Sequence, residues 1–93
     1  MTNKELLEHK LGQHMVDALN RYIEHGIEPG SFLYAVLSND LKGAVGRADH
    51  NNQRLIFEYV AYLYNYCPAD CWGSPEKVEN WLKAFKEKFL EEQ

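Results

Sequence analysis

The chain has 93 residues, of which 45% are hydrophobic, 26% charged and 13% aromatic, and its formal net charge is −4. A chain of this length and composition forms one domain around one modest core, which excludes a disordered tail protein and a multi-domain enzyme. The net negative charge also argues against a surface built to bind phosphate groups.

The first predicted helix covers about residues 3–25. Thr2 and Glu5 form a capping-box pattern, in which two side chains bond free backbone N–H groups at a helix start. An apolar stripe then recurs at helical spacing: Leu7, Leu11, Met15, Ala18, Leu19, Tyr22 and Ile23. Gly26 predicts a left-handed helix stop, and Pro29 prevents the helix from continuing.

The next segment, about residues 30–48, has apolar residues at helical spacing and a polar step at residues 38–40 (Ser-Asn-Asp). One continuous helix and two short helices are both compatible with this pattern. We favour two helices with a break at the polar step, because Ser and Asn compete for backbone hydrogen bonds and cap helices well. Gly43 and Gly46 also weaken the second half of the segment.

The third helix is predicted over about residues 51–66. Its main apolar face contains Leu55, Ile56, Tyr59, Val60, Leu63 and Tyr66, and its other side carries Phe57, Ala61 and Tyr64. A helix that is apolar nearly all round is usually central in a fold. Phe57 and Tyr64 are either covered by a second layer of helices or form a surface for a partner, and we expect them to be covered.

Residues 67–73 are predicted to form a loop, and Ser74, Pro75 and Glu76 then provide a strong helix start. The last helix carries a narrow apolar stripe: Val78, Trp81, Leu82, Phe85 and Phe89. Trp72, in the loop, is either a plug for the core or an exposed anchor for a partner, and we expect a plug. No segment alternates like a strand. The prediction is therefore an all-α, compact single-domain bundle (residues 1–93) of four to five helices around the helix at 51–66.

Neither a catalytic motif nor a complete metal-ligand pattern occurs in the sequence. Cys67 and Cys71 have three residues between them, but no histidine pair completes a tetrahedral zinc site, so we expect two small buried thiols. No nucleophile elbow, phosphate-binding glycine loop or zinc-protease motif is present. We therefore expect no enzymatic activity, no catalytic residue, no metal and no cofactor.

A polar cluster follows the break in the second segment. Asp40 and Arg47 are seven residues apart, which places them at one edge of the apolar face if the helix continues. They are expected to form a structural ion pair, as most such pairs do. The other interpretation is a polar recognition patch in which Asp49 and Asn52 join Arg47. As candidate binding residues, Asp40, Arg47, Asp49 and Asn52 join the aromatic residues Phe57, Tyr64 and Trp72.

Several sequence blocks occur together in an order typical of one protein family. They are residues 22–33 (YIEHGIEPGSFL), 35–41 (AVLSNDL), 48–49 (AD) with Asn52, 62–65 (YLYN) and 71–75 (CWGSP). Over about residues 20–82, the chain resembles a family of small, functionally uncharacterised proteins of tailed bacteriophages and prophages. The resemblance implies a phage or prophage accessory protein, and it carries over no catalytic or binding residue.

These observations predict a non-catalytic accessory protein that binds a host or viral protein, with a homodimer also compatible. The alternative is a protein that binds or sequesters a small molecule or nucleotide through the polar cluster. DNA binding agrees less well, because residues 40–48 offer only Lys42 and Arg47 as basic groups. The polar amino terminus has no signal-peptide pattern, so we expect a cytoplasmic protein (in the host cell if phage-encoded), with no nucleic acid and no membrane as partner.

Overall fold

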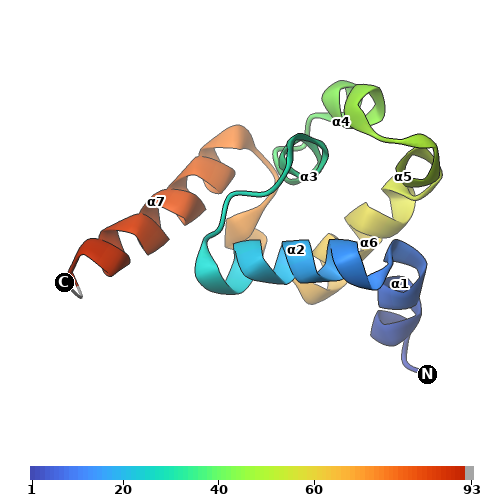
Figure 1. Ribbon diagram of the computed structural model, residues 1–93, viewed down its shortest axis with the longest axis horizontal. Helices are drawn as coiled ribbons and strands as arrows, with labels where there is room; N and C mark the ends of the chain where they lie inside the picture. Colours follow the sequence, from blue (N-terminus) through green and yellow to red (C-terminus); the bar gives the residue numbers. More distant parts are fainter. Residues whose placement is uncertain (92–93) are drawn as a thin grey trace.

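The computed structural model describes residues 1–91, which form seven α-helices and one 3-10 helix, with no strand in this part of the chain (Figure 1). The elements are α1 (Asn3–Leu11), α2 (Gln13–His25), α3 (Ser31–Leu37), α4 (Leu41–Arg47), α5 (His50–Arg54), α6 (Ile56–Tyr66), η1 (Ala69–Cys71) and α7 (Pro75–Glu91). The predicted all-α class is confirmed. The helices are shorter and more numerous than the predicted four or five, because two predicted helices are each interrupted once.

The first interruption lies at Gly12, between α1 and α2. The predicted capping box starts α1, where the Glu5 N–H donates to Thr2 Oγ1 at 3.1 Å. Gly12 has φ +93° and ψ 146°, a backbone conformation that is open to glycine and strained for other residues. The prediction of one helix over residues 3–25 is therefore wrong at this point. The bend lets α1 contact both α2 and α6.

The carboxyl end of α2 is where α7 docks. Gly26 is left-handed (φ +62°, ψ +30°), and the N–H groups of Gly26 and Ile27 return to carbonyls of the last helical turn, as predicted for a glycine stop. A Cβ at Gly26 would overlap the side chain of Phe85. Trp81 Nε1 donates to the Tyr22 carbonyl at 3.1 Å. The last turn of α2 is thus both the end of a helix and a seat for α7.

The predicted break between α3 and α4 is confirmed. Asn39 has φ +62°, and it is the non-glycine residue with positive φ in residues 1–91. Asp40 then caps α4, because its Oδ1 accepts from the Gly43 N–H at 2.9 Å. Asp49 caps α5 in the same way, accepting from the Asn52 N–H at 2.7 Å. Two short helices, each started by an aspartate, therefore follow α3.

The second interruption, at Leu55, was not expected within residues 51–66. Leu55 has φ −107° and ψ 8°, outside the helical range, and it separates α5 from α6. The shift in direction leaves α6 in contact with α1, α3 and α5.

The core lies where α2, α3, α6 and the first half of α7 meet. Its fully buried side chains are Leu19, Tyr22, Leu37, Tyr59, Leu63, Cys71 and Val78. Tyr22 OH donates to the Cys71 carbonyl at 2.7 Å, which fastens η1 to α2. The Gly73 N–H donates to the Leu37 carbonyl at 2.7 Å, which fastens the start of α7 to α3.

The carboxyl-terminal half of α7 extends away from the other helices (Figure 1). Phe89, the last residue of the predicted docking stripe, is 61% exposed there, so its predicted contact with the core is wrong. Three other stripe residues are buried or half-buried against the core: Val78, Trp81 and Leu82. Phe85 is half-buried beside Trp81, with ring centroids 5.7 Å apart. No helix within residues 1–91 has the length and apolar character needed to cross a lipid bilayer.

Candidate functional site

Helix α6 presents an apolar ridge to solvent. Phe57 is 78% exposed, Tyr64 is 77% exposed and Val60 is 41% exposed. Their spacing of three, four and seven residues places them on one side of the helix, and we call these three residues the α6 ridge. The expectation that other helices cover Phe57 and Tyr64 is therefore wrong.

The opposite face of α6 explains this orientation. Tyr59, Tyr62 and Leu63 are buried there. Tyr59 OH donates to Asn52 Oδ1 at 2.9 Å and Tyr62 OH donates to Glu8 Oε2 at 3.0 Å, so each buried phenol has a partner. Burial raises the pKa of Tyr59 to about 12, with a further increase from the nearby Asp49 carboxylate. Burial also raises the pKa of Tyr62, so both hydroxyls stay protonated at neutral pH. The core contacts thus hold α6 in an orientation that leaves the ridge uncovered by the described residues.

Two hollows adjoin the α6 ridge, one beside Val60 and one beside Tyr64. The first is small, about 40 Å³, and Val60 and Ile56 share it with Leu41 and Ala44 of α4. Leu41 is itself 67% exposed, so it extends the apolar surface beyond Val60.

The second hollow is larger, about 300 Å³, and is lined by Tyr64, Cys67, Ala69, Trp72, Gly73 and Lys77. Trp72 is half-buried and packs against the core, in agreement with the predicted plug, while also lining this hollow. The exposed Lys77 Nζ donates to the Ala69 carbonyl at 3.2 Å and makes no ion pair with any carboxylate in the described part of the chain. A cation without a carboxylate partner among residues 1–91 therefore lies next to the Tyr64 end of the ridge.

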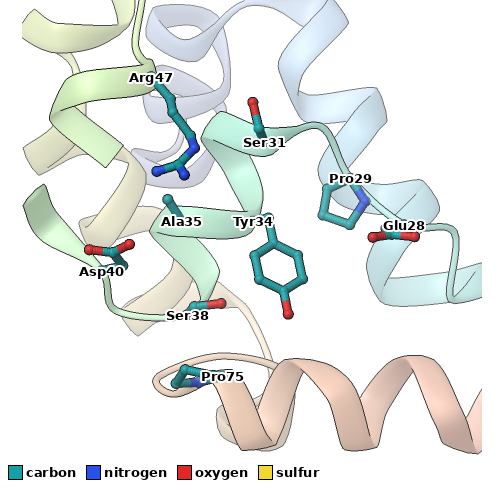
Figure 2. Close-up of a pocket in the computed structure, with 9 residues that line it drawn as sticks. All are labelled: Glu28, Pro29, Ser31, Tyr34, Ala35, Ser38, Asp40, Arg47 and Pro75. Carbon is teal, nitrogen blue, oxygen red and sulfur yellow. The ribbon is translucent and has the colours of Figure 1, made fainter. Parts of the chain in front are cut away.

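A separate groove crosses the face of α3 (Figure 2). Its volume is about 570 Å³, and its lining residues come from α3, α4, the loop before α3 and the start of α7: Glu28, Pro29, Ser31, Tyr34, Ala35, Ser38, Asp40, Arg47 and Pro75. We call it the α3–α4 groove. Its volume lies in the range of ordinary small-molecule sites.

Asp40 and Arg47 stand at the α4 side of this groove and point toward one another in Figure 2. The expected ion pair is absent, since no N–O distance between these two residues is within 4.0 Å in the described structure. Both side chains lie over Gly43, where a Cβ would overlap the Asp40 carboxylate and lie 2.7 Å from Arg47 Nη1. The glycine therefore makes room for a carboxylate and a guanidinium side by side.

Ser38 is the buried polar residue of the α3–α4 groove. Only 5% of its surface is exposed, and its Oγ has no hydrogen-bond partner. Sequence reasoning used this serine only as a sign of a helix break. The actual signal was a hydroxyl directly after the buried Leu37, on the side of α3 that also carries Ser31 and Ala35. Tyr34, Pro29 and Pro75 were missed as well, because the loop and α7 bring them to α3 only in the folded chain.

Asp49 and Asn52 do not line the α3–α4 groove. The Asp49 carboxylate caps α5, and the Asn52 side chain accepts the Tyr59 hydroxyl. Of the four candidate binding residues in the predicted polar cluster, the structure brings Asp40 and Arg47 together. Asp49 and Asn52 make local structural contacts instead.

The two cysteines are free thiols in the core region. Burial raises the pKa of Cys67 to about 12 and that of Cys71 to about 11. A protonated thiol is a poor nucleophile and a poor metal ligand, so the thiols act here as small apolar groups. Within residues 1–91, no three His, Cys, Asp or Glu side chains gather in a way that could hold a metal ion.

Comparisons with known proteins give no functional assignment, so a functional argument depends on the geometry of the α6 ridge and the α3–α4 groove. No protein-family model, no curated protein and no solved structure matches the chain.

Proposed function

We propose that this protein is a non-catalytic accessory protein that binds another protein through the α6 ridge. The observation that carries the proposal is the exposure of Phe57 and Tyr64 on a helix whose other face forms part of the core. Exposed aromatic side chains that stand together are typical of protein contact surfaces. The host or viral partner, and the phage or prophage context, remain predictions from the sequence resemblance.

The area of the ridge limits how it can bind. The exposed parts of Phe57 and Tyr64 amount to roughly 300 Å², and covering them would contribute on the order of 7 kcal/mol. Association itself opposes binding by about 4–15 kcal/mol. The two aromatic residues alone therefore support at most weak binding, and a stable complex also needs the hollows beside Val60 and Tyr64.

The charge beside the ridge indicates the partner chemistry. Lys77 lies at the Tyr64 end without a carboxylate partner among residues 1–91, and the hollow there is otherwise mostly apolar. A partner with an apolar face next to an acidic side chain would fill the hollow and pair with the lysine. We propose that combination as the surface recognised by the ridge.

Site-specific crosslinking tests the proposal. A photo-crosslinking residue replaces Tyr64 in one protein and Phe89 in the matched control, since Phe89 is also an exposed aromatic but lies on the far part of α7. We expect a discrete crosslinked protein from Tyr64 in host cells, absent with the Phe89 probe and lost when Phe57→Asp is added. The captured protein, once purified, is expected to bind the wild-type chain and not Phe57→Asp.

Two results would overturn the proposal. Equal capture of the same proteins from both positions would show that the ridge has no selectivity. Crosslinking of the chain to itself at Tyr64 would replace the proposed partner by a second copy, and a concentration-dependent mass in light scattering would accompany it.

A further inference from the structure

The α3–α4 groove contains a hydroxyl for which the fold provides no partner. Ser38 Oγ is buried and unbonded, although buried polar groups in folded proteins nearly always have a partner. The hydroxyl is not needed for the helix break, because the backbone of Asp40 closes that turn by donating to the Ala35 carbonyl at 2.9 Å. An unpartnered buried hydroxyl lowers the stability of the fold, and alanine at this position would avoid that loss. The serine is accounted for best by a ligand that completes its hydrogen bonding.

The lining of the same groove also offers one acceptor and one donor group that are both incompletely used. Asp40 Oδ1 caps α4, and Oδ2 has no hydrogen-bond partner among residues 1–91. Arg47 makes no ion pair and no side-chain hydrogen bond with the described residues, and its guanidinium lies above Ala35 in Figure 2. A carboxylate accepts and a guanidinium donates, so the pair presents an acceptor and a donor edge side by side.

The rest of the groove is mostly apolar and includes one aromatic ring. The Tyr34 ring lies between α3 and α7, and its hydroxyl donates to Glu79, which holds the ring in place. Pro29 and Pro75 flank it, and the Ala35 methyl group lies between the ring and Arg47. Such walls favour a planar ring over a flexible chain.

The charge of the groove selects against phosphate. Its lining contains two carboxylates, Glu28 and Asp40, and one cation, Arg47, so its formal charge is negative. A phosphate placed near Arg47 would also lie near the Asp40 carboxylate, where repulsion opposes the attraction. An uncharged ligand avoids this conflict.

We propose that the α3–α4 groove binds a neutral purine nucleoside whose base carries a carbonyl next to a ring N–H, with guanosine as the reference ligand. Arg47 donates to the base oxygen and ring nitrogen, Asp40 Oδ2 accepts from the ring N–H and amino group, and Ser38 Oγ forms a further hydrogen bond. The ring lies against Tyr34 and Ala35. This site is independent of protein binding at the α6 ridge, so failure of either proposal leaves the other standing.

The first test compares two aspartates that both cap the start of a helix. Asp40→Asn keeps an N-cap, because asparagine caps helices as well as aspartate does, but it places an amide where the groove needs a second acceptor oxygen. Asp49→Asn makes the same change at the cap of α5, outside the groove. Calorimetric titration with guanosine, adenosine and xanthosine measures each affinity.

We expect the wild-type protein to bind guanosine roughly tenfold or more tightly than adenosine. Asp40→Asn is expected to weaken guanosine binding by a similar factor. The variant should prefer xanthosine, whose additional carbonyl accepts a hydrogen bond where the guanine amino group donates one. Asp49→Asn is expected to keep the wild-type affinities. No saturable guanosine binding by the wild-type protein, equal binding of adenosine, or equal losses in the two variants would each overturn the proposal.

The second test uses Ser38→Ala, which separates ligand binding from folding. Removing an unpartnered buried hydroxyl is expected to raise the melting temperature of the free protein. The same change is expected to weaken guanosine binding about fivefold, because one hydrogen bond to the ligand is lost. A more stable protein with unchanged guanosine affinity would show that the hydroxyl does not face the ligand and would overturn its assigned role.

Discussion

Replacing Gly26 by alanine tests how α7 is seated on the rest of the fold. Gly26 is left-handed, a conformation in which alanine is strained by about 1–2 kcal/mol. The new Cβ would also overlap the Phe85 side chain, and forcing a carbon into a filled contact typically costs about 1–3 kcal/mol. We therefore expect Gly26→Ala to lower the free energy of unfolding by about 2–5 kcal/mol, measured by urea unfolding followed by circular dichroism.

A double-mutant cycle separates the two contributions. The closest atom to the added carbon is the Phe85 Cβ, so the overlap disappears only in a Phe85→Gly background. There Gly26→Ala should lower the unfolding free energy by only the conformational strain, about 1–2 kcal/mol. The difference between the two backgrounds then measures the contact between α2 and α7. An equal effect of Gly26→Ala in both backgrounds would refute the seating of α7 against this glycine.

Three further predictions concern α4 and α6. Gly46→Ala should raise the unfolding free energy by about 0.5–1 kcal/mol, because nothing lies within 4 Å of the added Cβ. Gly43→Ala should be about 1 kcal/mol less stable than Gly46→Ala, because its Cβ displaces the capping carboxylate of Asp40. Thermal melts compare the two variants. Tyr59→Phe should cost about 1 kcal/mol at neutral pH. The neutral Tyr59 phenol stabilises the fold below its unfolded pKa of about 10, and this contribution is lost as the pH rises through the folded pKa of about 12. Unfolding free energies measured from pH 9 to 12 should therefore fall less steeply in Tyr59→Phe than in the wild type. Parallel pH profiles of the two proteins would contradict the raised pKa. Phe57→Ala should stay within about 0.5 kcal/mol of wild type in urea unfolding, because its ring is mostly in water, and a loss above 2 kcal/mol would mean that the ring is covered.

Helix ends were predictable where a side chain or a glycine acts locally. The capping box of Thr2 and Glu5, the stop at Gly26 and the break at residues 38–40 all depend on hydrogen bonds within a few residues, and all are present. The all-α class follows from the same local signals and from helical apolar spacing.

The two unexpected interruptions have different explanations. At Gly12 the glycine was a visible signal, but the apolar stripe continues at the same spacing on both sides, so periodicity did not reveal the bend. At Leu55 the sequence contains no breaker at all. That interruption depends on where α5 and α6 meet other helices, and tertiary contact overrides local preference there.

The candidate site was only partly predictable for a similar reason. Asp40 and Arg47 were identified because their seven-residue spacing brings them to one side of a continuous helix, and the structure places both in one groove. Asp49 and Asn52 were included by sequence proximity alone. The exposure of Phe57 and Tyr64 depends on how many helices remain to cover α6, which residue patterns do not report.

The central claim is that α6 buries one face in the core and offers the other to a protein partner. Its most direct test is an equilibrium titration of the partner, identified by crosslinking and purified separately, against the wild-type chain, Phe57→Ala and Phe89→Ala. We predict that Phe57→Ala raises Kd about tenfold or more, while Phe89→Ala, which changes another exposed phenylalanine outside the ridge, stays within about twofold of wild type. An unchanged Kd for Phe57→Ala would contradict the claim.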